Sequence, residues 1–366
     1  MLNSAYFTVF FCMADQKINP NKIVLFAKCP GKTSFSSLYT IKHAFNTQKV
    51  GHTGTLDSFA SGLLVVCCGA LTRLAGRITE FDKTYEAVIK FGEETDTLEC
   101  TGKIIKTAEL PDVKKLKQAL SAFTGNIMQK PPAFSAIHID GKRASDLVRS
   151  GKSADIPARP VTVFSCELLE TKLTESDKVL AARIKFSVSK GTYIRSLARD
   201  IGEYCGSAAY LVGLLRTKVG NFELKNAAGF NLLENFTIDT AFENAKKTIE
   251  IERINEENKK KHVKEKHVKK KHVVTEEELL LQKNVVDSAV EMNKQLASLC
   301  GFASLTIKED KMPLFYNGGK LHSDWFDLSP FSIKEKFAAV FAEDNSFAGL
   351  LEKDENGYFK YSFVVH

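Results

Sequence analysis

The order of strand-like and helix-like segments is the feature that most constrains the fold of this chain. Residues 22–28, KIVLFAK, form a short apolar run typical of a strand, and residues 84–91, TYEAVIKF, alternate with the period of two that indicates a half-buried strand. Helix-like stretches lie at 36–45 and at 112–123, the latter with its apolar side chains on one face. Strands and helices thus mix without the regular rhythm of a doubly wound parallel sheet, which predicts an α+β fold.

Three further segments fit the same class. Residues 63–71, LLVVCCGAL, are apolar enough for a buried strand or helix, and residues 182–189, ARIKFSVS, have a strand pattern that precedes a helix from about 196 to 204. Residues 129–143 contain a proline pair, a short strand and an Asp-Gly turn. We therefore expect one large domain over residues 21–235.

The character of the chain changes beyond this domain. Residues 236–298 are dense in charge, which predicts a solvated helical or disordered linker or insertion. Strand patterns return in KFAAVFA (336–342), FAGLLEK (347–353) and YFKYSFVV (358–365). Residues 299–366 are therefore predicted to form a small β-rich domain.

The formal net charge of +7 is carried by one short segment. Residues 259–271 contain eight lysines and one acidic residue, Glu265, so this segment has a net charge of +7. The net charge of the whole chain is the same, and the rest of the chain is therefore about neutral. A positive charge confined to one segment is weak support for RNA binding. The functional alternative for the segment itself is that its lysines contact a phosphate backbone.

The cysteines and the N-terminus indicate a cytoplasmic protein without a metal site. The chain has 8 cysteines, with no CxxC pair and no His/Cys spacing that suits zinc, so they are predicted to be reduced, mostly buried thiols. Residues 1–20 are predicted to form a disordered tail. Their apolar run, residues 6–13, is shorter than the about 20 residues that span a membrane, and no basic segment precedes it.

The irregular stretch GHTGTLD, residues 51–57, ends in a carboxylate. Its two glycines, one histidine and two threonines make a poor helix and a poor strand, so it is predicted to be a tight loop. The carboxylate of Asp57 has three conceivable tasks, which are to cap the next helix, to bind a metal or to carry chemistry. These seven residues leave all three open.

Four motifs resemble those of one family. Residues 50–74, VGHTGTLDSFASGLLVVCCGALTRL, resemble the catalytic stretch of the bacterial TruB-type tRNA pseudouridine synthases. Residues 82–104, 131–151 and 189–222 resemble the family's second, third and fourth motifs, in the family's order. The resemblance implies a pseudouridine synthase fold, with a central mixed, largely antiparallel sheet flanked by helices and loops. Residues 299–366 resemble the family's small PUA-like RNA-binding domain in strand pattern and in MPLFYNGGKLH.

This family isomerises a uridine in the T-arm of tRNA, at the position conventionally numbered 55, from an N-glycoside to a C-glycoside. The resemblance therefore implies a monomeric tRNA pseudouridine synthase that binds the T-arm stem-loop and needs no cofactor, metal, membrane or obligate protein partner. Two alternatives stay open here. One is an RNA chaperone or inactive homologue that binds tRNA without modifying it, and the other is a synthase of the same fold with another uridine target or a guide RNA.

The resemblance also assigns three catalytic residues. Asp57 matches the family's nucleophile, and a carboxylate suits that task because it can bond reversibly to a sugar or base carbon. Attack at C1′, attack at C6 and elimination from C2′ all stay open. Arg195, at the end of GTYIR, matches the arginine that pairs with this carboxylate and fixes its rotamer. Tyr85 matches the tyrosine that packs against the target base, and its hydroxyl is also able to move a proton from C5.

Substrate-binding residues follow from the same resemblance. The target base is stacked inside a folded loop and must be flipped out, at a cost of a few kcal/mol. His52 matches the residue that fills the vacated space, while Tyr193 and Leu214 match positions that line the uridine pocket together with Tyr85. By residue type alone, these side chains would be ordinary core or loop residues.

The chain departs from the family's pattern at several positions. The usual proline after the catalytic aspartate is Ser58 here, which removes a residue that fixes φ and is predicted to loosen the loop. The family's LRR is LLR at 214–216, and its lysine–proline–glycine turn is only approximated by residues 28–31. The first change removes no group that does chemistry, and the lost arginine is predicted to weaken an RNA or structural contact.

Overall fold

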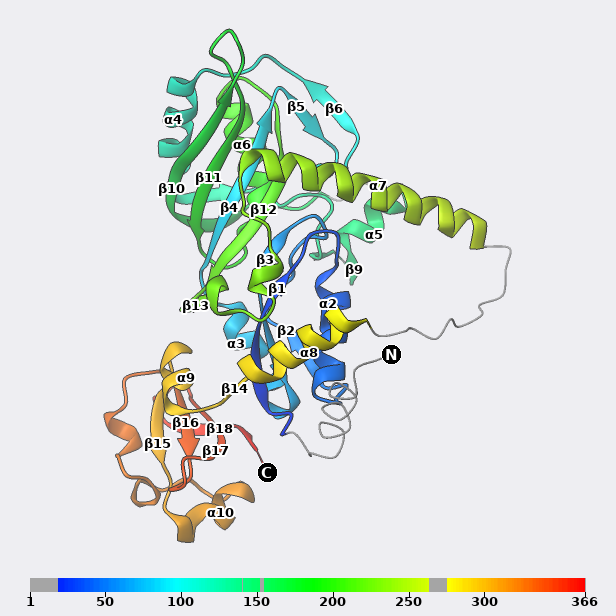
Figure 1. Ribbon diagram of the computed structural model, residues 1–366. Helices are drawn as coiled ribbons and strands as arrows, with labels where there is room; N and C mark the ends of the chain where they lie inside the picture. The colour runs from blue at the N-terminus through cyan, green and yellow to red at the C-terminus, as the bar shows by residue number, and fades with distance from the viewer. Residues whose placement is uncertain (1–18, 140, 152–154, 263–274, 366) are drawn as a thin grey trace, which may run out of the picture.

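The computed structural model describes residues 19–139, 141–151, 155–262 and 275–365 (Figure 1). Residues 1–18 of the predicted tail and most of the lysine-rich segment 259–271 lie outside this range. Figure 1 shows two bodies, a large one around the main sheet and a smaller one, in orange and red, built from the C-terminal residues.

The main sheet is mixed and largely antiparallel, as predicted. Within the described chain it has ten strands, and every pairing among them is antiparallel except that of β12 with β3. The order along the main path is β14 (Val290–Glu291), β1 (Lys22–Lys28), β3 (Ser61–Cys68), β12 (Ala209–Val219), β4 (Lys83–Phe91), β11 (Val179–Val188), β10 (Arg159–Leu173) and β7 (Gly125–Gln129), with β2 (Val50–His52) beside β3 and β13 (Phe222–Glu223) beside β12.

The remaining elements cover this sheet or extend from it. The helices are α2 (Ser34–Ala44), α3 (Ala75–Thr79), α4 (Val113–Ala122), α5 (Ala144–Arg149), α6 (Ile194–Tyr204), α7 (Ile238–His262) and α8 (Glu276–Ser288). Two small hairpins pair β5 (Glu93–Thr95) with β6 (Ile104–Thr107) and β8 (His138–Ile139) with β9 (Lys142–Arg143). The strands predicted at 22–28, 84–91 and 182–189 and the helix at 112–123 are confirmed.

The parallel pairing of β3 with β12 depends on a glycine. Gly62 lies opposite Arg216, and a Cβ atom at position 62 would stand 2.4 Å from the Arg216 carbonyl oxygen. Gly62 also has φ of +112°, a conformation that L side chains rarely adopt. Glycine therefore permits the close approach that joins the end of the Asp57 loop to β12.

Helix α6 begins two residues before the predicted helix start at about residue 196. Tyr193 is extended and precedes the first turn, and its amide donates to the Gln129 side-chain oxygen at 2.8 Å. The side-chain amide of Gln129 donates back to the Tyr193 carbonyl oxygen at 3.1 Å. A distant glutamine thus satisfies backbone groups at the helix start, which local sequence patterns do not reveal.

The charged residues 236–298 differ from a fully solvated linker. Ile238, Ala241 and Ala245, on the first turns of α7, are buried in the core formed by β4, β11, β12 and α6. Helix α8 packs against α2, and β14 pairs with β1. Charge density describes the average of the segment, whereas burial depends on a few apolar positions three or four residues apart. The predicted division into residues 21–235, 236–298 and 299–366 stays a prediction.

The C-terminal body contains a separate sheet in the order β15 (Ala303–Thr306), β16 (Phe337–Phe341), β17 (Phe347–Lys353) and β18 (Phe359–Val364), together with α9 (Lys294–Leu299) and α10 (Met312–Tyr316). The three predicted strands are confirmed, and β15, which pairs parallel to β16, was not predicted. Arg77 of α3 joins the two bodies, because its guanidinium lies 2.6 Å from the Glu352 carboxylate and 4.3 Å from the Phe337 ring centroid.

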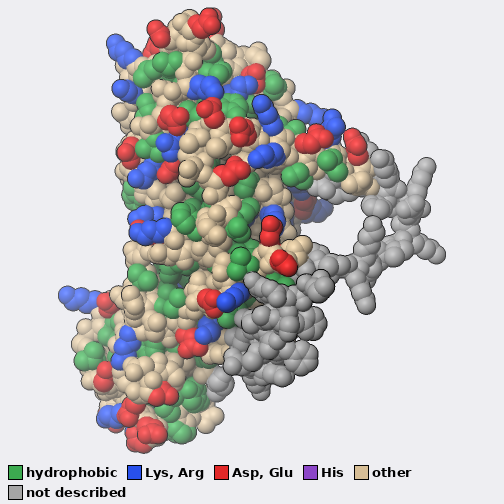
Figure 2. Space-filling view, in the orientation of Figure 1, with side chains coloured by type: hydrophobic (Ala, Val, Ile, Leu, Met, Phe, Trp, Pro, Cys, Tyr) green, Lys and Arg blue, Asp and Glu red, His purple; other side chains and the backbone are tan. Residues whose placement is uncertain are grey.

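Surface charge is mixed on the face shown in Figure 2, where Lys and Arg side chains are interspersed with Asp and Glu. This distribution agrees with a body that is nearly neutral outside the lysine-rich segment. Among the described helices, none combines the length and the apolar character needed to cross a bilayer.

Candidate active site

The Asp57 loop connects β2 to β3 and is held from one side by Ser34. The Ser34 hydroxyl donates to the Leu56 carbonyl oxygen at 3.0 Å and accepts from the Leu56 amide at 2.8 Å. A hydroxyl group can do both because it has one donor and two acceptor positions. The backbone is therefore fixed at the residue immediately before Asp57.

Lys28 holds the loop from the other side. Its side chain is fully buried, and the amine donates to the carbonyl oxygens of Cys29, Ser58 and Ala60. Burial lowers the pKa of Lys28 to about 7, while the neighbouring Asp57 carboxylate acts to raise it. The amide of Gly31 also donates to the Ser58 carbonyl oxygen, at 2.8 Å. Ser58 and Ala60, which follow Asp57, are thus bonded to the last residue of β1, and Ser58 is also bonded to the turn after that strand.

The structure brings Asp57 and Arg195 together, as the resemblance implied. Nη2 of Arg195 donates to Oδ1 of Asp57 at 3.2 Å. Nε lies 3.1 Å from Oδ2, close enough for an ion pair but not aligned for a hydrogen bond. The Arg195 side chain is 7% exposed and that of Asp57 is 33% exposed. The carboxylate is therefore oriented by a buried cation and still open to solvent.

Arg195 also joins two segments that contain the other motifs. Its Nη1 donates to the Thr97 carbonyl oxygen at 3.0 Å, and Nη2 donates to the Phe134 carbonyl oxygen at 2.9 Å. Thr97 lies between β5 and β6, and Phe134 lies in the proline-rich segment before β8. The planar guanidinium has enough fixed donors to hold these groups and Asp57 at once, which a lysine ammonium does not.

Glu99 is a site residue that sequence reasoning missed. Its carboxylate lies 3.8 Å from Nη1 of Arg195, and its side chain is 13% exposed. Burial raises the pKa of Glu99 to about 7, with a further increase from the Asp57 carboxylate and an opposing effect of Arg195. An acidic residue in a turn-rich stretch is usually solvated. Its position inside the second motif, TDTLECTG, was the one available signal.

We expect Glu99→Gln to stabilise the protein more at pH 8 than at pH 5. Because the pKa of Glu99 in the folded protein is above its ordinary value of 4.5, the folded state binds more protons than the unfolded state between about 4.5 and 7. The carboxyl group therefore costs stability progressively as pH rises through this window, and glutamine removes that cost. The gain should be on the order of 1 kcal/mol or more in urea unfolding at pH 8.

Glu109→Gln is the matched control, since Glu109 is exposed in the same domain. Its unfolding free energy should follow that of the unsubstituted protein at both pH values. A Glu99→Gln effect that is the same at pH 5 and pH 8 would contradict the raised pKa.

Tyr85 lies on β4 between Phe186 of β11 and Arg216 of β12. Tyr85 is 9% exposed. It belongs to the same apolar cluster as Leu56 and Phe59, which lie one residue before and two residues after Asp57. The ring is thus placed in the apolar wall beside the loop, at the sheet end where the loop joins β3.

No hydrogen bond or ion pair among the described residues joins His52, Tyr193 or Leu214 to the carboxylate of Asp57. His52 ends β2, is half-buried, and accepts from the Gly54 amide through Nδ1 at 3.4 Å, while burial lowers its pKa. Tyr193 precedes α6, with the Arg159 guanidinium 5.3 Å from its ring centroid. Leu214 is buried on β12 opposite Ala87. Among the described residues, the carboxylate of Asp57 pairs with Arg195.

Arg216 is a second residue that sequence reasoning missed. It is almost completely buried, and it donates to the Leu63 carbonyl oxygen at 2.7 Å and to the Gly54 carbonyl oxygen at 3.1 Å. These bonds tie the beginning of the Asp57 loop to the strand that follows it. The retained arginine of LLR is therefore a structural member of the site.

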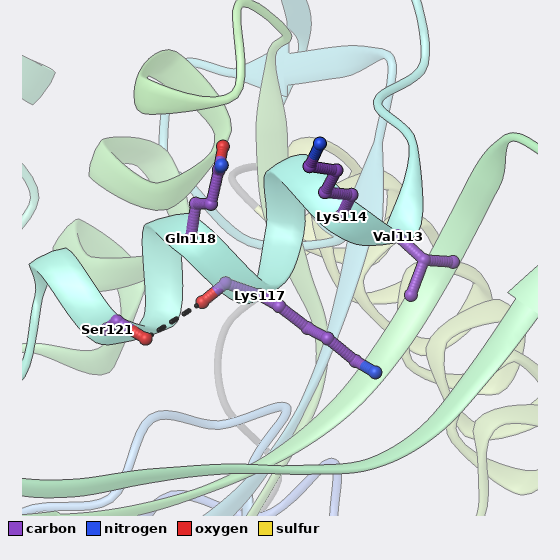
Figure 3. Close-up of a pocket in the computed structure, with 5 residues that line it drawn as sticks. All are labelled: Val113, Lys114, Lys117, Gln118 and Ser121. Carbon is purple, nitrogen blue, oxygen red and sulfur yellow. Dashed lines mark hydrogen bonds between the residues drawn. The ribbon is translucent and has the colours of Figure 1, made fainter.

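Two other features were considered as candidate sites, a metal-binding cluster and a hollow on α4. Across the described residues, no group of three or more His, Cys, Asp or Glu side chains is arranged to hold a metal ion. The hollow in Figure 3 is lined by one helix, and its residues are Val113, Lys114, Lys117, Gln118 and Ser121. Neither Asp57 nor Arg195 nor Glu99 lines this hollow.

The chain is similar in sequence to a known family and to named relatives. The family described as TruB family pseudouridylate synthase (N terminal domain) matches residues 42–194. The tRNA pseudouridine synthase B of Treponema denticola is 39% identical over 352 residues, which cover 90% of this chain and 94% of that protein. The protein of the same name from Borreliella burgdorferi strain ZS7 is 48% identical over 208 residues, covering 57% of this chain and 72% of that protein.

Solved structures support the fold. A structure of an H/ACA RNP bound to a substrate RNA containing 2′-deoxyuridine has a chain with a TM-score of 0.58 and 18% identity, covering 94% of this chain and 85% of that chain. A Cbf5-Nop10-Gar1 complex gives a TM-score of 0.57 at 20% identity, with the same coverages of 94% and 85%. At these identities the likeness concerns the fold alone, and the predicted fold class is confirmed.

Proposed function

Because the chain belongs to the TruB family of pseudouridylate synthases, we propose that it converts uridine 55 in the T-arm of tRNA to pseudouridine. It is an isomerase, and the tRNA substrate is taken from the names of its relatives. The observation that carries the proposal is the Asp57 carboxylate, partly exposed and oriented by a buried arginine. An arrangement of this kind provides a positioned nucleophile that a substrate can reach.

In the proposed reaction Asp57 is the nucleophile. The bond between N1 of uracil and C1′ of ribose breaks, the base rotates and a bond forms between C5 and C1′. C5 loses its proton and N1 takes one up, so the product is an isomer of the substrate. Attack of the carboxylate at C1′ and its attack at C6 each account for these changes with Asp57 as the nucleophile. Elimination from C2′ also accounts for them, with the Asp57 carboxylate as the base that removes the C2′ proton. Arg195 fixes the carboxylate rotamer through its hydrogen bond to Oδ1 and its ion pair with Oδ2.

We assign the remaining predicted residues to base binding. Tyr85, in the apolar wall beside the loop, stacks on the target base, and Tyr193 and Leu214 line the pocket with it. His52, at the opposite end of the loop from Asp57, fills the space that the flipped base leaves. Lowering of its pKa by burial favours the neutral imidazole, which stacks without adding a charge to desolvate.

The proposed partner is the T-arm of tRNA, with one copy of this chain acting without another protein. The alternative of an RNA chaperone or inactive homologue is less well supported, because a protein that only binds RNA has no need of the Asp57–Arg195 pair. A synthase with another uridine target differs from the proposal in specificity and not in chemistry.

The test is the activity of the purified chain on a transcribed tRNA with no added factor. We expect one pseudouridine at position 55, detected by chemical derivatisation and by mass analysis of fragments. A transcript with cytidine at position 55 is the control and should stay unmodified. Tight binding with every uridine unchanged would favour the chaperone alternative, and modification elsewhere would favour another target.

A further inference from the structure

Helix α7 has a stripe of buried residues, and the next position along it lies beside the Asp57 loop. Ile238, Ala241, Ala245 and Thr248 are all buried and follow one another at spacings of three and four residues. The Thr248 hydroxyl is satisfied by the Asn244 carbonyl oxygen of the same helix, at 2.8 Å. The next position on this face is residue 252, where the sequence places a glutamate.

Glu252 meets the residue that follows the proposed nucleophile. The Ser58 hydroxyl donates to Oε1 of Glu252 at 3.4 Å. The neighbouring Ile251 packs beside the turn after β1, since its Cδ1 lies 3.7 Å from where a Cβ of Gly31 would stand. Gly31 in turn donates to the Ser58 carbonyl oxygen. Ile251 and Glu252 of α7 therefore contact the turn after β1 and the loop that contains Asp57.

The contact coincides with a departure from the family's pattern. Where the family has a proline, which fixes φ, this chain has Ser58, which leaves the backbone freer and adds a hydroxyl group. We propose that Glu252 is a positioning residue, which restrains the Asp57 loop through Ser58 in place of the proline. The part of this inference that concerns catalysis rests on the proposed function.

The surroundings of Glu252 support this placement. Its negative charge is one contribution to the raised pKa of Glu99. Figure 1 shows α7 passing the main sheet and projecting beyond the large body. The charged segment, which composition describes as a linker, thus contacts the Asp57 loop through Glu252 and the turn after β1 through Ile251.

The test compares Glu252→Ala with Glu252→Gln, which removes the charge but keeps an oxygen acceptor. We expect Glu252→Ala to lower the single-turnover rate of pseudouridine formation by about three- to tenfold, the size expected for one partly exposed hydrogen bond, with little change in KM. Glu252→Gln should restore most of the rate. Glu250→Ala is the matched control, because it removes the same charge from an exposed position on the same helix.

A second pair of variants asks whether Ser58 transmits the effect. Ser58→Ala should reproduce the loss seen in Glu252→Ala, and the double substitution should cost no more than either alone. In Ser58→Pro, where the ring fixes the backbone, adding Glu252→Ala should have no further effect.

Hydrogen exchange of the amides of residues 56–60 provides a readout that does not depend on activity. Glu252→Ala should accelerate their exchange and Glu252→Gln should not. If both variants change alike and bind RNA more tightly, the charge acts directly on RNA and the positioning role is wrong; no change in either variant also overturns it. If the unsubstituted protein leaves tRNA unmodified, the proposed function fails, and the exchange comparison still tests the restraint.

Discussion

Asp57→Asn should abolish pseudouridine formation, with a single-turnover rate lower by about 10⁴-fold or more, as expected when a covalent nucleophile is removed. An amide is too weak a nucleophile to attack a sugar or base carbon. Asparagine has nearly the same shape and keeps an oxygen that can accept from Nη2 of Arg195, so the loop and the pocket should persist. The rate is measured with excess enzyme on a transcribed tRNA.

Two measurements separate this outcome from a folding defect. The variant should bind the transcript with a Kd close to that of the unsubstituted protein and should unfold at a similar urea concentration. Asp239→Asn is the control, since Asp239 is a highly exposed carboxylate on α7, and it should keep full activity. Full activity in Asp57→Asn would exclude Asp57 as the nucleophile.

Arg195→Met is expected to affect both rate and stability. It removes the donor to Asp57 and leaves Glu99 as a buried carboxylate without its cation. The carbonyl oxygens of Thr97 and Phe134 lose their donor as well. We expect the rate to fall by about 10²- to 10³-fold and the free energy of unfolding to fall by about 3–5 kcal/mol.

Arg195→Lys tests whether charge or geometry matters. Lysine keeps the positive charge near Asp57 and Glu99. Its single ammonium nitrogen cannot replace the planar guanidinium, which donates to Asp57, Thr97 and Phe134 at once. Its stability should therefore lie between those of the unsubstituted protein and Arg195→Met, while its rate should stay close to that of Arg195→Met. A fully active Arg195→Lys would show that the cation acts only through its charge.

Periodicity was enough to predict the α+β class and several individual elements. The alternation at 84–91 reflects β4, which has neighbours on both edges in the sheet, and the apolar face at 112–123 reflects α4. The strand β15 was missed because four residues carry too little periodic signal. The packing of α7 was missed because its three buried apolar positions are hidden in a segment whose average character is charged.

For the candidate site, residue type predicted less than the order of the four motifs. Asp57 and Arg195 were expected to pair from their positions in the motifs, and the structure places them in contact. Glu99, Lys28 and Arg216 were not singled out for the site. Each is a charged residue whose importance here comes from burial, and a sequence does not distinguish a buried charge from a solvated one.

By itself, the sequence determined the class of fold, the loop that ends at Asp57 and the chemical group offered there, since these depend on local periodicity, turn residues and side-chain identity. Only the tertiary structure decided the environment of that group. Arg195 and Glu252 reach the loop from two separate segments of the chain, and Glu99 reaches Arg195 from a third. Orientation and burial arise from such long-range contacts, which have no local pattern in the sequence.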